Sequence, residues 1–170
     1  AFGDRTYDKA TSEYMISPGT MAVDSPVSAV IKEAAGRGIP ILGICNGFQI
    51  LIQLGLLKGD LLLNDNGKFT CRQVKCEVPW YDFTTELYIA NSYGKYSVSD
   101  EEYVELEKNN QIFLKYSGDI PEVGSAKRIA GVCDPGRKIF GMMPHPERNN
   151  CDMKHILYKL ILPIMHPIHT

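Results

Sequence analysis

Apolar residues follow helical spacing and unbroken runs in the first third of the chain, and strict alternation further on. Residues 24–38 (DSPVSAVIKEAAGRG) place Ser25 at an N-cap position and Pro26 at the first helical position. Gly36 or Gly38 suits the C-terminal end of a helix. The apolar residues that share one face at helical spacing are Val27, Val30, Ile31, Ala34 and Ala35. This pattern predicts an amphipathic helix.

Two further apolar segments follow directly. IPILGI (39–44) is a short unbroken run, which is typical of a strand covered on both faces of a sheet. GFQILIQLGLL (47–57) has the length and composition of a largely buried helix. A helix, a buried strand and a second helix in succession indicate an α/β layered domain.

The second half of the chain alternates apolar and polar residues. In CRQVKCEV (71–78), Val74, Cys76 and Val78 fall on one face and polar residues on the other. The other strand candidates are ELYIA (86–90), QIFLKY (111–116), RIAGVC (128–133) and KIFGMM (138–143), and the clearest turns are NDNG (64–67) and DPGR (134–137). A last helix is expected over roughly residues 150–162. Helices should therefore flank a mixed sheet.

Length and charge narrow the class of protein. The chain has 170 residues, which is enough for a single domain over 1–170 and too few for two ordinary ones. The formal charge of −2 is spread without long runs, which argues against nucleic-acid or membrane-surface binding. Five irregularly spaced cysteines form neither a disulfide framework nor a zinc pattern. We expect a cytoplasmic protein without a metal site or a membrane span.

Cys45 stands where the apolar strand changes into the helix, in GICNG (43–47). A nucleophile on a tight strand-to-helix turn needs neighbours without side chains, and Gly43 and Gly47 lie two residues to either side. The following helix points its free N–H groups at the sulfur, which favours the nucleophilic thiolate. The Asn46 backbone N–H is expected to point toward an oxyanion formed on an attacked carbonyl. The pattern favours a cysteine nucleophile over a packed core cysteine.

The other four cysteines are interpreted differently. Cys71, Cys76 and Cys133 lie in strand-like segments and are expected to pack as small hydrophobic residues. Cys151 lies near the start of the last expected helix, and nothing beyond that position favours a role for it.

A base for the nucleophile is found in GMMPHPERN (141–149). A cysteine nucleophile needs a base, and the base needs a group that orients it. His145 and Glu147 are separated by one proline and follow a strand candidate, at the kind of strand end where catalytic groups collect in α/β sheets. Alone, His-Pro-Glu is typical of a polar turn; together with the Cys45 segment it is far more specific.

These segments resemble the class I (triad-type) glutamine amidotransferases, and most closely the glutaminase subunits of phosphoribosylformylglycinamidine synthases. The similarity is carried by GICNGFQIL, GLLKGDLLLN, FTCRQV, IAGV and GMMPHPER, which occur in the family's order and extend from about Gly3 to Arg148. The resemblance implies a flavodoxin-like class I glutaminase fold, an α/β arrangement with a mixed, mostly parallel sheet and helices on both faces. In the family a strand, a helix, a strand and a Pro-Gly-Gly-Phe loop precede the segment matching AFGDR, so we expect this sequence to be N-terminally incomplete.

The resemblance also implies a reaction. Cys45 would attack the side-chain amide of glutamine, His145 would pass the thiol proton to the leaving ammonia, and Glu147 would orient His145. Water would then hydrolyse the glutamyl thioester to glutamate.

Substrate and partners follow from the same resemblance. Gln49, Asn46 and Gly47 are expected to line the glutamine site. Ammonia would pass to a synthetase subunit that makes formylglycinamidine ribonucleotide in purine biosynthesis, with a small accessory subunit as a further partner. ATP and magnesium are expected on the synthetase, and no cofactor is expected on this chain.

One segment departs from the family pattern. IANSYGKY (89–96) stands where the family reads close to Ile-Ala-His-Gly-Glu-Gly-Arg-Tyr, so that Asn91, Tyr93 and Lys95 replace a histidine, a glutamate and an arginine. Three alternatives stay open on the sequence alone: a glutaminase of another amidotransferase, a non-catalytic docking module, and a cysteine-based stress or redox protein.

Overall fold

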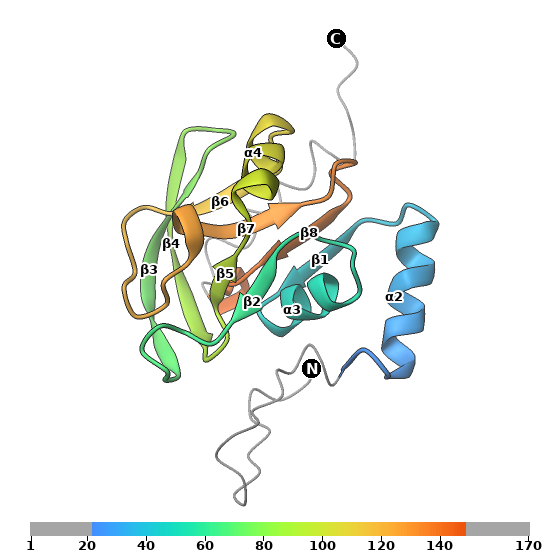
Figure 1. The fold of residues 1–170 in the computed structure, drawn as a ribbon, viewed down its shortest axis with the longest axis horizontal. Helices are drawn as coiled ribbons and strands as arrows, with labels where there is room; N and C mark the ends of the chain where they lie inside the picture. Colours follow the sequence, from blue (N-terminus) through green and yellow to red (C-terminus); the bar gives the residue numbers. More distant parts are fainter. Residues whose placement is uncertain (1–21, 149–170) are drawn as a thin grey trace, which may run out of the picture.

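A computed structural model describes residues 22–148, and the helix expected near residues 150–162 lies outside this range, as does Cys151 (Figure 1). The elements are, in chain order, α2 (Pro26–Gly36), β1 (Ile41–Ile44), α3 (Asn46–Gln53), β2 (Asp60–Leu62), β3 (Thr70–Val78), β4 (Phe83–Asn91), β5 (Lys95–Ser97), α4 (Asp100–Lys108), β6 (Ile112–Tyr116), the 3₁₀ turn η1 (Ala126–Arg128), β7 (Ile129–Cys133), β8 (Ile139–Met142) and the 3₁₀ turn η2 (Pro146–Arg148). None of the helices within residues 22–148 has the length and apolar character needed to cross a bilayer.

Most strands belong to one mixed sheet, as predicted. Its order is β1-β8-β7-β6-β3-β4, and β2 pairs separately with β5. β1 runs parallel to β8, with Ile41 opposite Ile139 and Ile44 opposite Met142. Every other pairing between described strands is antiparallel, so the expectation of a mostly parallel sheet is wrong for this part of the chain. The reason is that short turns join β3 to β4 and β7 to β8, and such turns connect antiparallel neighbours only.

Two clusters of buried side chains cover the two faces of the sheet. One contains Phe48 from α3 and Leu106 from α4, with Ile31 from α2 at its margin. The other is built from strand residues such as Leu87 and Phe113. The described helices thus all contribute to the same face, and a helix on the opposite face stays a prediction, since the last expected helix lies outside residues 22–148.

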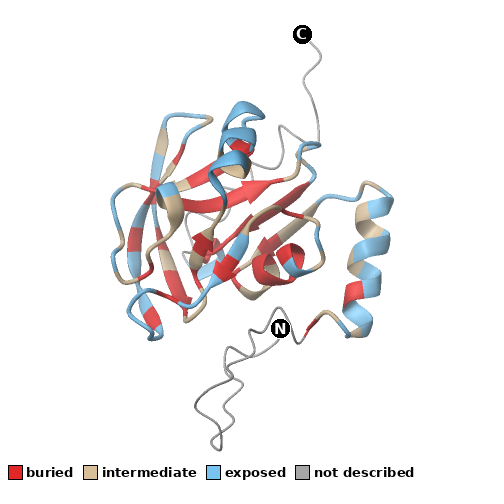
Figure 2. Ribbon diagram, viewed as in Figure 1, coloured by how far each residue is buried: buried red, intermediate tan, exposed pale blue. Residues whose placement is uncertain are grey.

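The two helices that flank β1 differ in burial, as Figure 2 shows. α3 is almost entirely buried, whereas α2 exposes most of its surface. α2 begins as predicted, with Ser25 as N-cap and Pro26 in its first turn. Its apolar face is covered only in part, because Val27 and Val30 are exposed. β1 is the outermost described strand on this side, so no further described strand lies beneath that end of the helix.

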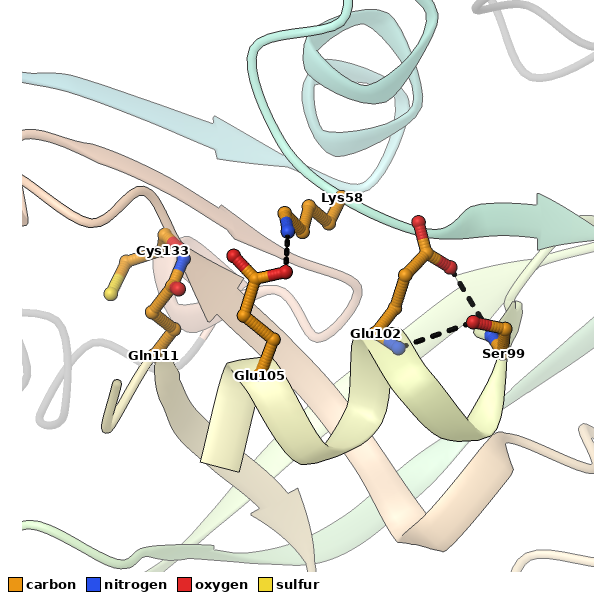
Figure 3. Close-up of polar contacts among 6 residues, drawn as sticks. All are labelled: Lys58, Ser99, Glu102, Glu105, Gln111 and Cys133. Carbon is orange, nitrogen blue, oxygen red and sulfur yellow. Dashed lines mark hydrogen bonds and ion pairs between the residues drawn. The ribbon is translucent and has the colours of Figure 1, made fainter. Parts of the chain in front are cut away.

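The sequence pattern missed α4 and the short pair β2 and β5. α4 begins with a reciprocal cap: the Glu102 backbone N–H donates to Ser99 Oγ at 3.1 Å, and the Ser99 N–H donates to the Glu102 carboxylate at 3.2 Å (Figure 3). An ion pair between Lys58 and Glu105 connects α4 to the segment before β2 (Figure 3). The helix therefore completes the face of the sheet that α3 also covers.

Candidate active site

Cys45 occupies a strained turn between β1 and α3. Its backbone has φ 51° and ψ −105°, a conformation that side-chain-bearing residues rarely adopt. The turn is anchored on both sides, because the Cys45 N–H donates to the Met142 carbonyl at 2.8 Å and the Cys45 carbonyl accepts from the Gln49 N–H at 3.1 Å. Cys45 is the N-cap residue of α3, so its sulfur lies at the helix N-terminus. The predicted strand-to-helix elbow is confirmed.

The two glycines around Cys45 have different surroundings. A Cβ on Gly43 would lie 2.7 Å from the backbone carbon and oxygen of Gly47 and 2.6 Å from Leu51 Cδ1. Gly43 therefore allows α3 to approach β1. A Cβ on Gly47 would meet no described atom within 4 Å. The space beside Gly47 is thus open, and the glycine there leaves room for something other than the described part of the chain.

The curl of the sheet brings its two outermost strands together at Cys45. β1 and β4 stand at opposite ends of the six-strand order, yet Cys45 Sγ lies 3.8 Å from the Ala90 carbonyl of β4. Two residues earlier on β4, the Tyr88 carbonyl accepts a hydrogen bond of 2.7 Å from the His145 N–H. Carbonyls two residues apart point to the same edge of a strand and lie about 7 Å apart. Cys45 and His145 are therefore neighbours along one edge of β4.

His145 and Glu147 form a close pair at the turn η2. His145 Nδ1 lies 2.6 Å from Glu147 Oε1, and the intervening Pro146 limits how the two side chains can separate. His145 is 9% exposed, and its Nε2 is buried with no hydrogen-bond partner among the described residues. The Glu147 carboxylate only accepts hydrogen bonds, so an Nδ1 proton directed at it leaves the lone pair of Nε2 available.

The residues expected to line the substrate site lie beside Cys45. Gln49 is buried, and its Nε2 donates to the Tyr93 carbonyl at 3.1 Å. Its Oε1 has no partner within the described part of the chain. Asn46 Oδ1 lies 4.0 Å from Cys45 Sγ. The direction of the Asn46 N–H toward an oxyanion stays a prediction.

Asn64 is a structural residue of the site that the sequence interpretation did not single out. Its Nδ2 donates to the Asn91 carbonyl at 2.9 Å, and its Oδ1 accepts from the Gly94 N–H at 2.9 Å. Its own N–H donates to the Ser92 carbonyl at 2.8 Å. One buried side chain thus holds both ends of the turn after β4. Asn64 is the last residue of the GLLKGDLLLN segment and the first residue of the predicted turn NDNG (64–67), and that turn was the signal available.

The other three described cysteines lie within strands rather than at a strand-to-helix turn, and two of them are buried, as Cys45 is. Burial, with a smaller effect of the Glu77 carboxylate, raises the pKa of Cys76 to about 12. Burial and the neighbouring Asp134 raise the pKa of Cys133 to about 12 as well. Both are core residues, as predicted. Cys71 is exposed, so its predicted packing is wrong: it lies on the polar face of the alternating strand β3. No group of three or more His, Cys, Asp and Glu side chains is placed to hold a metal ion within residues 22–148.

The mixed α/β sheet with its strand-to-helix turn at Cys45 is similar to the fold of the class I glutamine amidotransferases. A family model described as the CobB/CobQ-like glutamine amidotransferase domain matches residues 8–159, and the chain belongs to this family.

The chain is also similar to individual proteins whose names fit this family. The chain is 41% identical over 140 residues to phosphoribosylformylglycinamidine synthase subunit PurQ of Synechococcus, and 37% identical over 139 residues to the subunit of the same name from Bartonella henselae. Each match covers 76% of this chain and 62% of the relative, so the chain spans about three-fifths of their length. The structure of PurLQS from Thermotoga maritima matches with a TM-score of 0.72 and 35% identity, over 89% of this chain and 74% of the other. The predicted class I glutaminase fold is confirmed.

Proposed function

We propose that this chain hydrolyses glutamine to glutamate and ammonia, and that it supplies the ammonia to a synthetase making formylglycinamidine ribonucleotide in purine biosynthesis. The observation that carries the proposal is the position of Cys45 on its strained turn, next to the strand edge that also holds His145. The names of the relatives support the particular pathway.

Three residues carry the chemistry in this proposal. Cys45 Sγ attacks the side-chain amide carbon of glutamine, and a tetrahedral oxyanion forms. His145 Nε2 takes the thiol proton and delivers it to the departing nitrogen, so that ammonia leaves and a glutamyl thioester remains on Cys45. His145 Nε2 then deprotonates a water molecule, which attacks the thioester and releases glutamate together with the free thiol. Glu147, 2.6 Å from Nδ1, holds the imidazole in one tautomer and stabilises its charged form.

The open space beside Gly47 and the buried side chain of Gln49 form the substrate side of the site in this proposal. The Asn46 N–H stabilises the oxyanion at the start of α3. We propose a PurL-type synthetase and a small PurS-type subunit as the partners, by analogy with the PurLQS structure. ATP and magnesium are used on the synthetase rather than on this chain.

Ammonia release from glutamine tests the proposal, with wild type, Cys45→Ala, Glu147→Gln and the control Cys71→Ser measured with and without a synthetase subunit. Cys45→Ala should abolish release, and Glu147→Gln should lower kcat by on the order of 10²-fold or more, since it weakens the orientation of the base. Cys71 is exposed on the polar face of β3, so Cys71→Ser should match wild type.

The outcomes separate the alternatives. Ammonia release without amidine formation in the complex would point to another amidotransferase. Binding of the synthetase by a wild type that releases no ammonia would point to a docking module. Full activity in Cys45→Ala would contradict the proposal itself.

A further inference from the structure

Asn91, the last residue of β4, has a fully buried side chain that forms no hydrogen bond within the described chain. Both its Oδ1 and its Nδ2 are without a partner among residues 22–148. Buried polar groups are almost always hydrogen-bonded, and each exception calls for a reason. Gln49 Oε1 and His145 Nε2 are buried and without a described partner in the same way.

These unpartnered atoms belong to residues around Cys45. Asn91 directly follows Ala90, whose carbonyl lies 3.8 Å from Cys45 Sγ. The Asn91 amide lies against Gly94, where a Cβ would come within 2.1 Å of Oδ1. Between these two residues, the Tyr93 carbonyl accepts the Gln49 Nε2 hydrogen bond. The carboxamides of Asn91 and Gln49 thus approach the same short turn beside the nucleophile.

A structural role does not account for the Asn91 side chain. The turn after β4 is held by Asn64, which binds the Asn91 carbonyl and the Gly94 N–H, and whose backbone binds the Ser92 carbonyl. The Asn91 side chain adds no hydrogen bond to this set within the described residues. An apolar side chain of the same shape would fill the position without leaving buried polar atoms.

We propose that Asn91 and Gln49 together recognise the primary carboxamide of the substrate. The Asn91 side chain offers a carbonyl acceptor and an NH₂ donor, which complement the NH₂ and C=O of another carboxamide. Gln49 Oε1 is an acceptor only and accepts a substrate N–H. This inference rests on the proposed glutaminase function and makes Asn91 a substrate-binding residue.

Asn91→Leu tests the inference, because leucine keeps the branched shape and removes both polar atoms. We expect an unchanged or raised Tm, since no described hydrogen bond is lost, and a KM for glutamine that rises about tenfold, as expected for the loss of a buried hydrogen bond to substrate. The rate at which methyl methanethiosulfonate, a small thiol reagent without an amide, modifies Cys45 should stay within about twofold of wild type. All variants are measured as the full chain in complex with the synthetase.

Gln111→Met is the matched control. Gln111 is also a buried carboxamide whose Oε1 has no described partner, but it follows α4, and its Nε2 donates to the Cys133 carbonyl at 2.7 Å (Figure 3). Its replacement should lower Tm and leave the KM unchanged. An unchanged KM in Asn91→Leu would overturn the inference while leaving the glutaminase proposal intact. A Tm that falls as in Gln111→Met would overturn it in favour of a structural role. A wild type that hydrolyses no glutamine would overturn the proposed function, and the inference with it.

Discussion

Replacing Gly43 or Gly47 by alanine is expected to damage the protein in two different ways, although the two glycines lie symmetrically around Cys45. An alanine Cβ at position 43 would lie 2.7 Å from the Gly47 backbone and 2.6 Å from Leu51 Cδ1. Ordinary contacts between such atoms are about 3.5–4.0 Å long, so the overlap is roughly 1 Å, and part of it is with backbone. At position 47 the Cβ would meet no described atom within 4 Å.

The expected free energies follow from these contacts. Overpacking of this kind costs about 1–3 kcal/mol, so Gly43→Ala should lower the free energy of unfolding by that amount. In a chain of this size the loss corresponds to a fall in Tm of roughly 2–12 °C. Gly47→Ala places alanine near the start of α3, where it should leave stability unchanged or raise it by about 0.5–1 kcal/mol. Its effect should instead be on glutamine hydrolysis, because the Cβ enters the space proposed for the substrate.

Urea unfolding and ammonia release measured on the same preparations separate the two effects. Gly36→Ala, at the end of α2 and also free of contacts within 4 Å in the described structure, is the control: it should raise stability by no more than about 0.5–1 kcal/mol, as Gly47→Ala does, and leave ammonia release unchanged. Gly43→Ala should lose stability and activity together, and Gly47→Ala should lose activity alone. The reasoning is refuted if Gly47→Ala destabilises as much as Gly43→Ala, or if it hydrolyses glutamine at the wild-type rate.

Three further predictions concern stability. The raised pKa values of Cys76 and Cys133 contribute stability that is complete below about pH 9, the ordinary thiol pKa, and is lost as pH rises toward 12. At pH 10 each thiol should lower the free energy of unfolding by about 1.4 kcal/mol. The urea midpoint should therefore fall with rising pH in wild type and fall less steeply in Cys76→Val. A wild-type midpoint that does not change with pH would contradict this prediction. Ser99→Ala removes the cap of α4 and should lower the free energy of unfolding by about 1 kcal/mol while leaving ammonia release unchanged. An unchanged urea midpoint would show that the cap does not contribute to stability. In Gly141→Ala the new Cβ would lie 2.0 Å from Phe48 Cδ2, so the free energy of unfolding should fall by about 1–3 kcal/mol or more. A wild-type Tm in this variant would show that α3 can shift to make room.

The elements that the sequence predicted are those whose burial leaves a periodic pattern. β3 alternates because Val74, Cys76 and Val78 face the core, and α3 was recognisable as a buried apolar run. α4 left no such pattern, because Leu106 is its only buried residue. Its signal was local instead, namely the Ser-x-x-Glu capping box that begins at Ser99.

The sequence predicted only those residues of the candidate site that belong to short local motifs. Cys45 with its glycines, and His145 with Glu147, each form a local motif. Asn64 acts on a turn about thirty residues away, and the contact between Cys45 and β4 depends on the curl of the whole sheet. Such long-range contacts follow from register and curvature, which the alternation of single strands does not specify.

Selective labelling tests whether Cys45 is the activated nucleophile of a glutamine site. An electrophilic glutamine analogue, a diazoketone, should be incubated with the full chain and its synthetase, and the adduct located by intact mass and peptide mapping. We expect one adduct per chain, on Cys45 alone, suppressed by excess glutamine and absent in Cys45→Ala. Labelling of the exposed Cys71 in place of Cys45, or labelling that glutamine does not suppress, would contradict this expectation.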